Sequence, residues 1–317
     1  MISAKIIADS VNELGDRLTT FVLVFPRIVL AEFNTHRVFS RNSASSRAIP
    51  FEKMLKMVKE NPFIPIKWMK EHKGMQGSDY FENNDIIKSE NDLLQLWLLA
   101  RDKAVESANQ LSQYGLTKQV CNRILEPFMW HTVIVTSNDY ENFFALRAHG
   151  AAEIHIQKLA YEMLDVYNSS TPNILSPGQW HIPFGDQFDD ERIDKLMPEI
   201  QPASLNWYME MMDAIKVKVA TARCARVSYL NFEGKDDYEA DVKLHDNLLT
   251  MGHFSPFEHC AKAMSKDEVY RSERIELIDG AYSKSQGWSG NLKGFIQYRK
   301  FIKNENRNDS RVINLTK

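Results

Sequence analysis

The chain has 317 residues, of which 44% are hydrophobic and 26% charged, as in soluble globular proteins. Its formal net charge of −3 excludes a general affinity for polyanions, so we expect no nucleic-acid partner and only local phosphate sites. The cysteines form no CxxC pair, which argues against a zinc ribbon or a disulfide framework. We expect a cytoplasmic protein without a membrane anchor, because we find neither a secretory signal nor an apolar run of about eighteen residues.

The first part of the chain alternates apolar and polar segments. Residues 18–25 are apolar and β-branched and predict a buried strand, followed by a helix whose first turn tolerates Pro26. A polar, serine-rich stretch spans residues 36–50, and residues 51–60 predict a helix. Proline, glycine and asparagine cluster in residues 61–85, which predicts an irregular surface segment.

Helices dominate the rest of the chain. The clearest apolar stripe spans residues 89–114, with Gly115 as a C-cap. We expect Thr117 to cap a further helix that ends before Pro127, and Asn138 or Asp139 to cap another. The remaining predictions are a strand over residues 130–136, a loop over 169–190, and helices over 151–167, 203–222 and 238–251, the last one ended by Gly252.

Many helices with few strands predict an α+β fold. We expect one domain over residues 1–317, with irregular insertions at 61–85 and 168–200 and a flexible tail at 303–317. Residues 290–300 mix aromatic and basic side chains; we favour a core element there over a strand and helix that cover a site. Neither GxGxxG nor GxxxxGK[ST] occurs, so no Rossmann or P-loop nucleotide site is indicated.

Residues 35–47, THRVFSRNSASSR, form the most unusual segment. Their thirteen positions hold three arginines, one histidine and four serines. The planar fork of arginine suits phosphate, and serine hydroxyls with loop amides can line an anion pocket. The alternative is a solvated surface loop, the default for polar segments.

Two further segments combine polar residues with apolar ones. Residues 139–149 place Asn142 and Arg147 on a helix whose apolar side faces a core, and ordinary solvated charges are the alternative. Residues 252–259, GHFSPFEH, contain two histidines and a glutamate. Their spacing is not HExxH and no cysteine joins them, so we expect no metal site.

These segments resemble flavin-dependent thymidylate synthases. That family carries the signature RHRxxSxNExSxR and the blocks ARVSF and GHxTPFEH. Residues 225–229, ARVSY, and residues 252–259 are similar to the two blocks, and a third block is similar to residues 120–127 and 142–147. The signature matches the chain at His36, Arg37, Ser40, Asn42, Ser45 and Arg47.

The blocks stand in a different order from that of the family, in which ARVSF and GHxTPFEH precede the signature. A circular permutation is the simplest account, because domains with adjacent termini tolerate it. The resemblance then implies a central mixed or antiparallel sheet packed by long helices, with extra helical insertions. Permutation also predicts that His259 and Leu18 lie close in space.

The resemblance implies reductive methylation of dUMP to dTMP, with FAD as the cofactor and with methylenetetrahydrofolate and NADPH as co-substrates. It also implies a homotetramer whose active sites draw on several subunits. Ordinary thymidylate synthases attack the pyrimidine with a cysteine in a conspicuous motif. Cys121, Cys224 and Cys260 have no such setting, so we expect each to be a buried structural thiol.

The family's site residues carry over by position. Catalytic roles fall to Ser45, Arg147 and His253. The deoxypyrimidine monophosphate would be bound by Glu32, Ser43, Ser45, Arg47, Arg123 and Arg147, and the cofactor by His36, Arg37, Asn142, Ser228, His253, Ser255 and Glu258.

Two positions depart from the family pattern. Thr35 stands where the signature has its first arginine, and Ser43 where it has glutamate; Glu32, one helical turn before His36, is placed to compensate. These changes leave open a 5-hydroxymethyl product, formed when water completes the reaction, and cytidylate as the substrate. An inactive flavin- or nucleotide-binding paralogue is another alternative. A helical scaffold would explain the helices but not the motifs.

Overall fold

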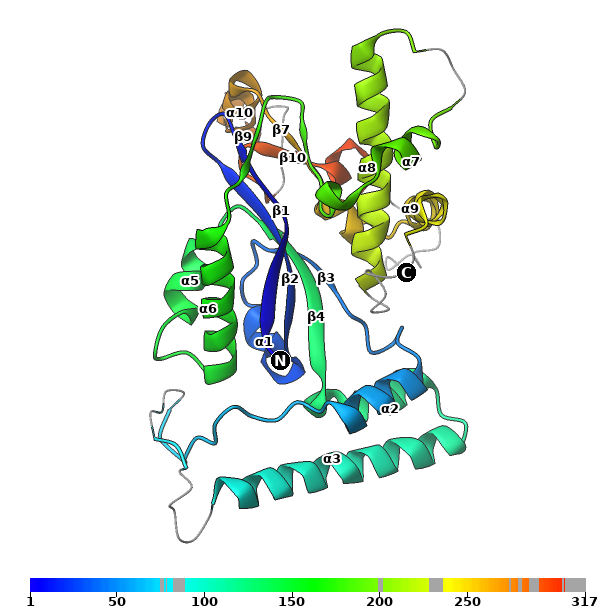
Figure 1. Cartoon of the computed structure of the whole chain (residues 1–317). Helices are drawn as coiled ribbons and strands as arrows, with labels where there is room; N and C mark the ends of the chain where they lie inside the picture. Colours follow the sequence, from blue (N-terminus) through cyan, green and yellow to red (C-terminus); the bar gives the residue numbers. More distant parts are fainter. Residues whose placement is uncertain are drawn as a thin grey trace.

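The fold is built on a five-stranded sheet (Figure 1). The computed structural model describes residues 1–74, 77, 79–81, 89–198, 202–227, 236–273, 275–278, 281–284, 291–303 and 305. The strand order is β3-β4-β2-β1-β5, with only β1 and β5 parallel. The predicted α+β fold with a mixed central sheet is therefore confirmed. The strands are β1 (Ser3–Asn12), β2 (Arg17–Pro26), β3 (Ser40–Ser43), β4 (Trp130–Ser137) and β5 (Asn173–Leu175).

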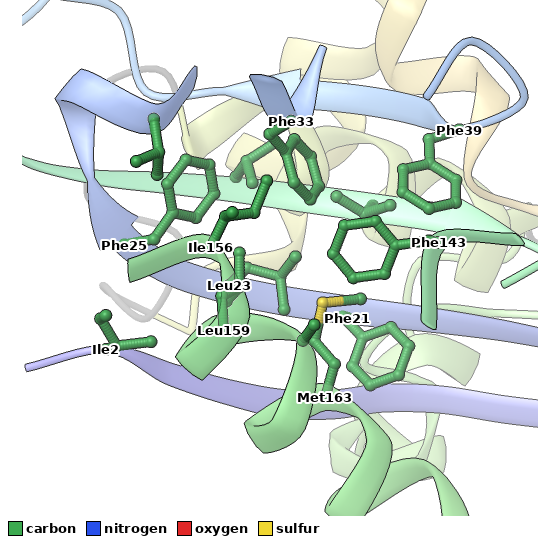
Figure 2. Packing of buried hydrophobic residues seen from close by; sticks show 14 of the residues in the cluster. Ile2, Phe21, Leu23, Phe25, Phe33, Phe39, Phe143, Ile156, Leu159 and Met163 are labelled. Atoms are coloured by element: carbon green, nitrogen blue, oxygen red, sulfur yellow. The ribbon is translucent and has the colours of Figure 1, made fainter. Parts of the chain in front are cut away.

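The largest core cluster lies between this sheet and helices α5 (Glu141–Arg147) and α6 (Ile154–Ser169). The central strands β2 and β4 are rich in β-branched and apolar residues, as strands covered on both faces require. Figure 2 shows Phe21 and Leu23 of β2 packed near Leu159 and Met163 of α6. Full burial of each such side chain contributes roughly 1.5–3 kcal/mol.

Helix α8 (Leu205–Arg226) reaches the other face of the sheet with its C-terminal end, and α9 (Tyr238–Met251) packs against α8. Ile7, Val22 and Ile134 of the sheet pack there against Cys224 at the end of α8. Both helices were predicted from the sequence. Gly252 ends α9 at a φ of 76°, a left-handed conformation in which a side chain would be strained.

A third helical group lies beyond one end of the sheet, at the bottom of Figure 1. It consists of α2 (Phe51–Glu60), α3 (Glu90–Gln113) and α4 (Lys118–Ile124). Residues of α2 and α3 share one hydrophobic cluster with Leu125, which directly follows α4. Ser89 and Asp92 form a capping box at the start of α3, and Gly115 follows its end with a φ of 83°. The predicted helices over 51–60 and 89–114 thus form where expected.

Short elements complete the molecule. Strands β6 (Trp180–His181), β7 (Ala261–Ala263) and β10 (Phe295–Gln297) form a small sheet, and β8 (Ile275–Ile278) pairs with β9 (Ala281–Lys284). The short helices are α1 (Leu30–Phe33), α7 (Asp190–Asp194) and α10 (Lys266–Glu273). The 3-10 turns are η1 (Arg27–Val29), η2 (Glu126–Phe128), η3 (Gly185–Gln187), η5 (Ser255–Glu258) and η6 (Tyr298–Phe301).

A chain of buried side chains links the two larger sheets. His181 lies between the hydroxyls of Ser10, 2.9 Å from Nδ1, and Thr20, 2.8 Å from Nε2. Thr20 contacts Thr136 at 2.7 Å, and Thr136 contacts His259 Nδ1 at 2.8 Å. Burial lowers the pKa of His181 and of His259 to about 3. Both rings are therefore neutral and act as hydrogen-bonding groups.

The segment that follows η5 packs against the start of β2. Leu18 shares a hydrophobic cluster with Ala261 and Ala263, and His259 reaches Thr20 through Thr136. Permutation predicts a close approach of these two segments, and the structure has it. The permuted origin itself stays a prediction, because the same proximity follows from any chain that folds this way.

Several segments differ from their predictions. The sequence did not predict β1. Strand β3 forms within residues 36–50, and β5 and β6 lie within the predicted loop 169–190, so the insertion 168–200 is only partly irregular. Of the predicted tail, the structure describes only residues 303 and 305.

Of the predicted helix caps, one has the expected position and the other is wrong. Thr117 is the N-cap of α4, although its side chain makes no capping bond. Tyr140, not Asn138 or Asp139, is the N-cap of α5, because the Asn138 amide donates instead to the carbonyl of Lys293 at 2.6 Å.

All three cysteines are free and buried, as expected. No helix within the described ranges is both long and apolar enough to cross a membrane.

Candidate active site

Within the 35–47 segment, residues 40–43 form β3, an edge strand of the five-stranded sheet. Because side chains alternate along a strand, Asn42 and Arg41 point to opposite faces. The Asn42 amide donates to the carbonyl of Cys224 on the α8 side at 3.3 Å. Arg41 Nη1 donates to Asn34 Oδ1, beside α1, at 3.2 Å. This single segment therefore supplies polar groups to two different surroundings.

A pocket of about 490 Å³ opens on the α8 and α9 side of β3. Two sequence motifs meet in it, since Ser45 and Arg47 line it together with His253 and Ser255. We call it the motif pocket. Its lining residues among those described include no carboxylate. The other lining residues are the polar Asn42 and Gln119 and an apolar set of Ala48, Ala225, Leu244, Leu248, Met251 and Pro256.

Local sequence explains how the second motif reaches this pocket. The left-handed Gly252 turns the chain sharply after α9, and Pro256 opens η5, where its fixed φ suits the first turn. His253 and Ser255 are exposed, whereas Pro256 and Phe257 are buried. The buried Pro256 and Phe257 thus anchor the turn, and its polar side chains face the pocket.

A second polar group lies at the start of the 35–47 segment. Arg147, at the end of α5, donates from Nε to His36 Nε2 at 3.2 Å and from Nη2 to Thr35 Oγ1 at 3.4 Å. Burial and the charges of Arg147 and Arg41 lower the pKa of His36 to about 4. The ring is therefore neutral at pH 7. We call Thr35, His36, Arg37, Arg41 and Arg147 the arginine cluster.

Positive charge accumulates in the arginine cluster. Burial and the neighbouring charge of Arg37 lower the pKa of Arg41, while Glu258 opposes the fall. Three guanidinium groups beside one carboxylate leave an excess of donors and of charge, which suits a phosphate or diphosphate.

The shifted His36 gives a direct test of this arrangement. Replacing Arg147 with methionine should raise the pKa of His36, because it removes a nearby cation. The value should stay below 6.5, since burial is the larger cause. Histidine titration by NMR measures it. An unchanged pKa would show that Arg147 does not lie against the imidazole.

Comparison with known proteins points to one family. Residues 17–173 match the model of the thymidylate synthase complementing protein family. The match spans just under half of the chain and supports the flavin-dependent thymidylate synthase-like family that the motifs resemble, and with it a nucleotide-modifying enzyme.

The comparison with solved structures finds weaker likenesses. Two crystal structures of the UMP/dUMP methylase PolB from Streptomyces cacaoi, bound with 5-Br dUMP and with 5-Br UMP, are each 14% identical to this chain and cover 53% of it. The match spans 90% and 89% of those chains, with TM-scores of 0.42 and 0.41. No curated protein matches.

The thymidylate synthase complementing protein match covers only some of the motif blocks. It contains residues 35–47, 120–127 and 142–147. It does not contain residues 225–229 or 252–259, whose similarity to family blocks rests on their sequence. The motif pocket is nevertheless lined by residues from both groups.

Other residues carried over from the family lie outside the motif pocket. Arg123 is exposed on α4, one turn after Gln119, which lines the pocket. Asn142 is exposed in the first turn of α5. Ser43 is half-buried and lies on the Arg41 side of β3. Ser228 lies outside the described residues. Their functional roles stay predictions.

Two of the residues carried over from the family are carboxylates. Glu32 is half-buried on α1, and its Oε2 has no hydrogen-bond partner among the described residues. Glu258 accepts from Arg299 Nη1 at 2.5 Å. Neither carboxylate lines the motif pocket, and the compensating role of Glu32 stays a prediction.

Sequence reasoning missed several contributors. Gln119 and the apolar wall of α9 belong to no motif, and Arg41 is a variable position of the signature. Arg226 of the ARVSY block pairs with a carboxylate of α9. Its Nη2 lies 2.6 Å from the carboxylate of Asp241, which is fully buried. No sequence signal singled out Asp241, because a charged residue in a helix usually faces solvent.

Proposed function

We propose that the chain is an FAD-dependent enzyme that alkylates C5 of a deoxypyrimidine monophosphate, and that its reaction is the reductive methylation of dUMP to dTMP. Methylenetetrahydrofolate would donate the carbon unit and NADPH would be the reductant, in the cytoplasm. The observation that carries the proposal is the motif pocket. It unites Ser45 and Arg47 with His253 and Ser255, which are distant in sequence but belong to two blocks of the same family.

The chemistry of the motif pocket suits a pyrimidine nucleotide. The apolar wall that includes Leu244 and Leu248 can pack against a flat base and exclude water, and the exposed guanidinium of Arg47 can bind a phosphate through charge-assisted bonds. Ser45 and His253 would then lie where they can contact the base and the one-carbon donor. These roles rest on the family pattern.

The donor set of the arginine cluster fits FAD. A diphosphate needs several cationic donors, and Arg37, Arg41 and Arg147 gather around the neutral His36. His36 and Arg37, with Asn142, Ser255 and Glu258, would hold the cofactor. When bound, FAD would supply the hydride that completes the methylation.

The proposed assembly is a homotetramer. The residues of the arginine cluster do not line the motif pocket; they lie at the other end of the 35–47 segment. An active site that needs both the motif pocket and the arginine cluster is completed if the arginine cluster of one copy lies against the motif pocket of a second copy, as the family pattern implies.

The decisive test is a product assay. The purified chain is incubated without oxygen with FAD, NADPH, methylenetetrahydrofolate and dUMP, and in parallel with dCMP, and the nucleotides are analysed by mass spectrometry. A mass gain of one CH₂ on dUMP is the expected result. A gain of CH₂O would instead establish a hydroxymethylated product. Unchanged nucleotides with a flavin-loaded protein would contradict the proposed reaction.

Arg47 gives a sharper test of the motif pocket. Replacing it with alanine should weaken dUMP binding about 10- to 100-fold, because a hydrogen bond to a charged group contributes about 1.5–3 kcal/mol. Calorimetric titration measures the affinity. Lys103→Ala is the control, since Lys103 is 71% exposed on α3, far from the motifs in sequence. An Arg47→Ala protein that binds dUMP as the parent does would remove Arg47 from the substrate site.

A further inference from the structure

We propose that Arg299 is a positioning residue that fixes the carboxylate of Glu258 for cofactor binding. The inference rests on the proposed function, in which Glu258 contacts FAD. Arg299 lies in η6, outside the residues that match the family model, and no motif marks it. Its role follows from contacts that only the folded chain brings together.

The geometry places Glu258 under the control of Arg299. Arg299 Nη1 donates to Glu258 Oε1 at 2.5 Å. The guanidinium is itself held in place, because Nε donates to Glu305 Oε2 at 2.9 Å and its carbon lies 5.8 Å from the ring centroid of Phe254. A carboxylate bound to a group that cannot swing keeps one orientation and leaves its second oxygen for a ligand.

The neighbouring Gln297 fixes the backbone at the same point. Its side chain is 4% exposed, and its Nε2 donates to Ser40 Oγ at 2.9 Å and to the carbonyl of Glu258 at 3.1 Å. Both hydrogens of the amide are therefore used. Gln297 joins the signature segment to the η5 turn, and Arg299 then orients the side chain at the end of that turn.

The electrostatics support positioning over direct anion binding by Arg299. Glu258 and Glu305 both contact the Arg299 guanidinium, so its charge is matched within the protein. Arg41, by contrast, feels the field of Arg37 and keeps capacity for an anion. Glu258 is also the carboxylate that opposes the fall in the Arg41 pKa. Its orientation thus affects both the ligand and the arginine cluster.

The test is a double-mutant cycle in FAD affinity, measured by flavin fluorescence on the full chain. Arg299→Met should weaken FAD binding about 3- to 10-fold, since a mobile Glu258 must be ordered on binding. Arg299→Lys should recover part of the loss because it keeps a cation near Glu258. In the Glu258→Gln background, Arg299→Met should have little further effect, because the two residues act as a unit.

Lys300→Met is the matched control, because it removes a neighbouring cation that contacts Glu305 at 2.6 Å and leaves the Arg299–Glu258 pair in place. It should bind FAD as the parent does. Two results would overturn the positioning role when the parent protein binds FAD: Arg299→Met has no effect on the affinity, or it has the same effect with and without Glu258. Either result leaves the proposed function standing. A folded parent that binds no FAD overturns the proposed function, and this inference with it.

Discussion

Replacing Asp241 with alanine should lower the free energy of unfolding by about 3–5 kcal/mol, because it removes a fully buried carboxylate that pairs with both Arg226 and Arg223. The Asp241 carboxylate is fully buried, 2.6 Å from Arg226 Nη2 and 3.5 Å from Arg223 Nε. Burial raises its pKa to about 6 and the arginines oppose the rise, so it is charged at pH 7. The group joins α9 to the end of α8. Urea unfolding followed by circular dichroism measures the loss.

A solvent-facing pair between the same two helices provides the control. Lys218 of α8 lies 3.0 Å from Asp246 of α9, and Lys218→Met should cost less than about 1 kcal/mol. The double variant Asp241→Leu with Arg226→Met should recover much of the loss of Asp241→Ala, since it removes charge from both sides. Equal losses for Asp241→Ala and Lys218→Met would show that water reaches the buried group.

The sequence predicts the elements whose own residues determine them. β2 and β4 are apolar and β-branched, and α3 and α9 carry helical stripes that end at Gly115 and Gly252. Each such segment follows local propensity and burial, so its type and approximate bounds could be predicted.

The missed strands depend on distant partners. β1 contains Asp9, Ser10 and Asn12, which are buried only because Arg17, His181 and Gly294 hydrogen-bond to them. β3 has no β-branched residue and forms because β4 offers it a free edge. Such pairings arise from tertiary contacts that propensity cannot show.

The candidate site, like the fold, could be predicted only where the residues themselves carry the signal. Motif similarity selected Ser45, Arg47, His253 and Ser255, and the fold brings them to one pocket. It could not select Gln119 or Arg299, because their contribution depends on where α4 and η6 pack. It also could not show that the ARVSY arginine would pair with the buried Asp241.

Acidification should destabilise the protein well before its ordinary carboxylates are titrated. Burial lowers the pKa of His131, His181 and His259 to about 3, whereas an unfolded histidine has a value near 6.5. Below pH 6.5 the unfolded state therefore binds more protons, and stability that is complete above this pH is lost as the pH falls. Asp241, whose pKa is raised to about 6, acts in the opposite direction. The four groups together give a net loss of at most about 3 kcal/mol per pH unit.

The free energy of unfolding should be measured in urea between pH 7.5 and about 5, the range in which histidines titrate and ordinary carboxylates do not. His131→Phe should reduce the slope by about 1.4 kcal/mol per pH unit, whatever its effect on stability at pH 7.5. It removes one neutral ring that packs 5.4 Å from Phe25 and lies 3.1 Å from Arg27 Nη1. If the free energy of unfolding does not change over this range, the buried histidines are protonated as readily in the folded protein as in water. The hydrogen-bonded side chains from Ser10 to His259 would then have to open to solvent.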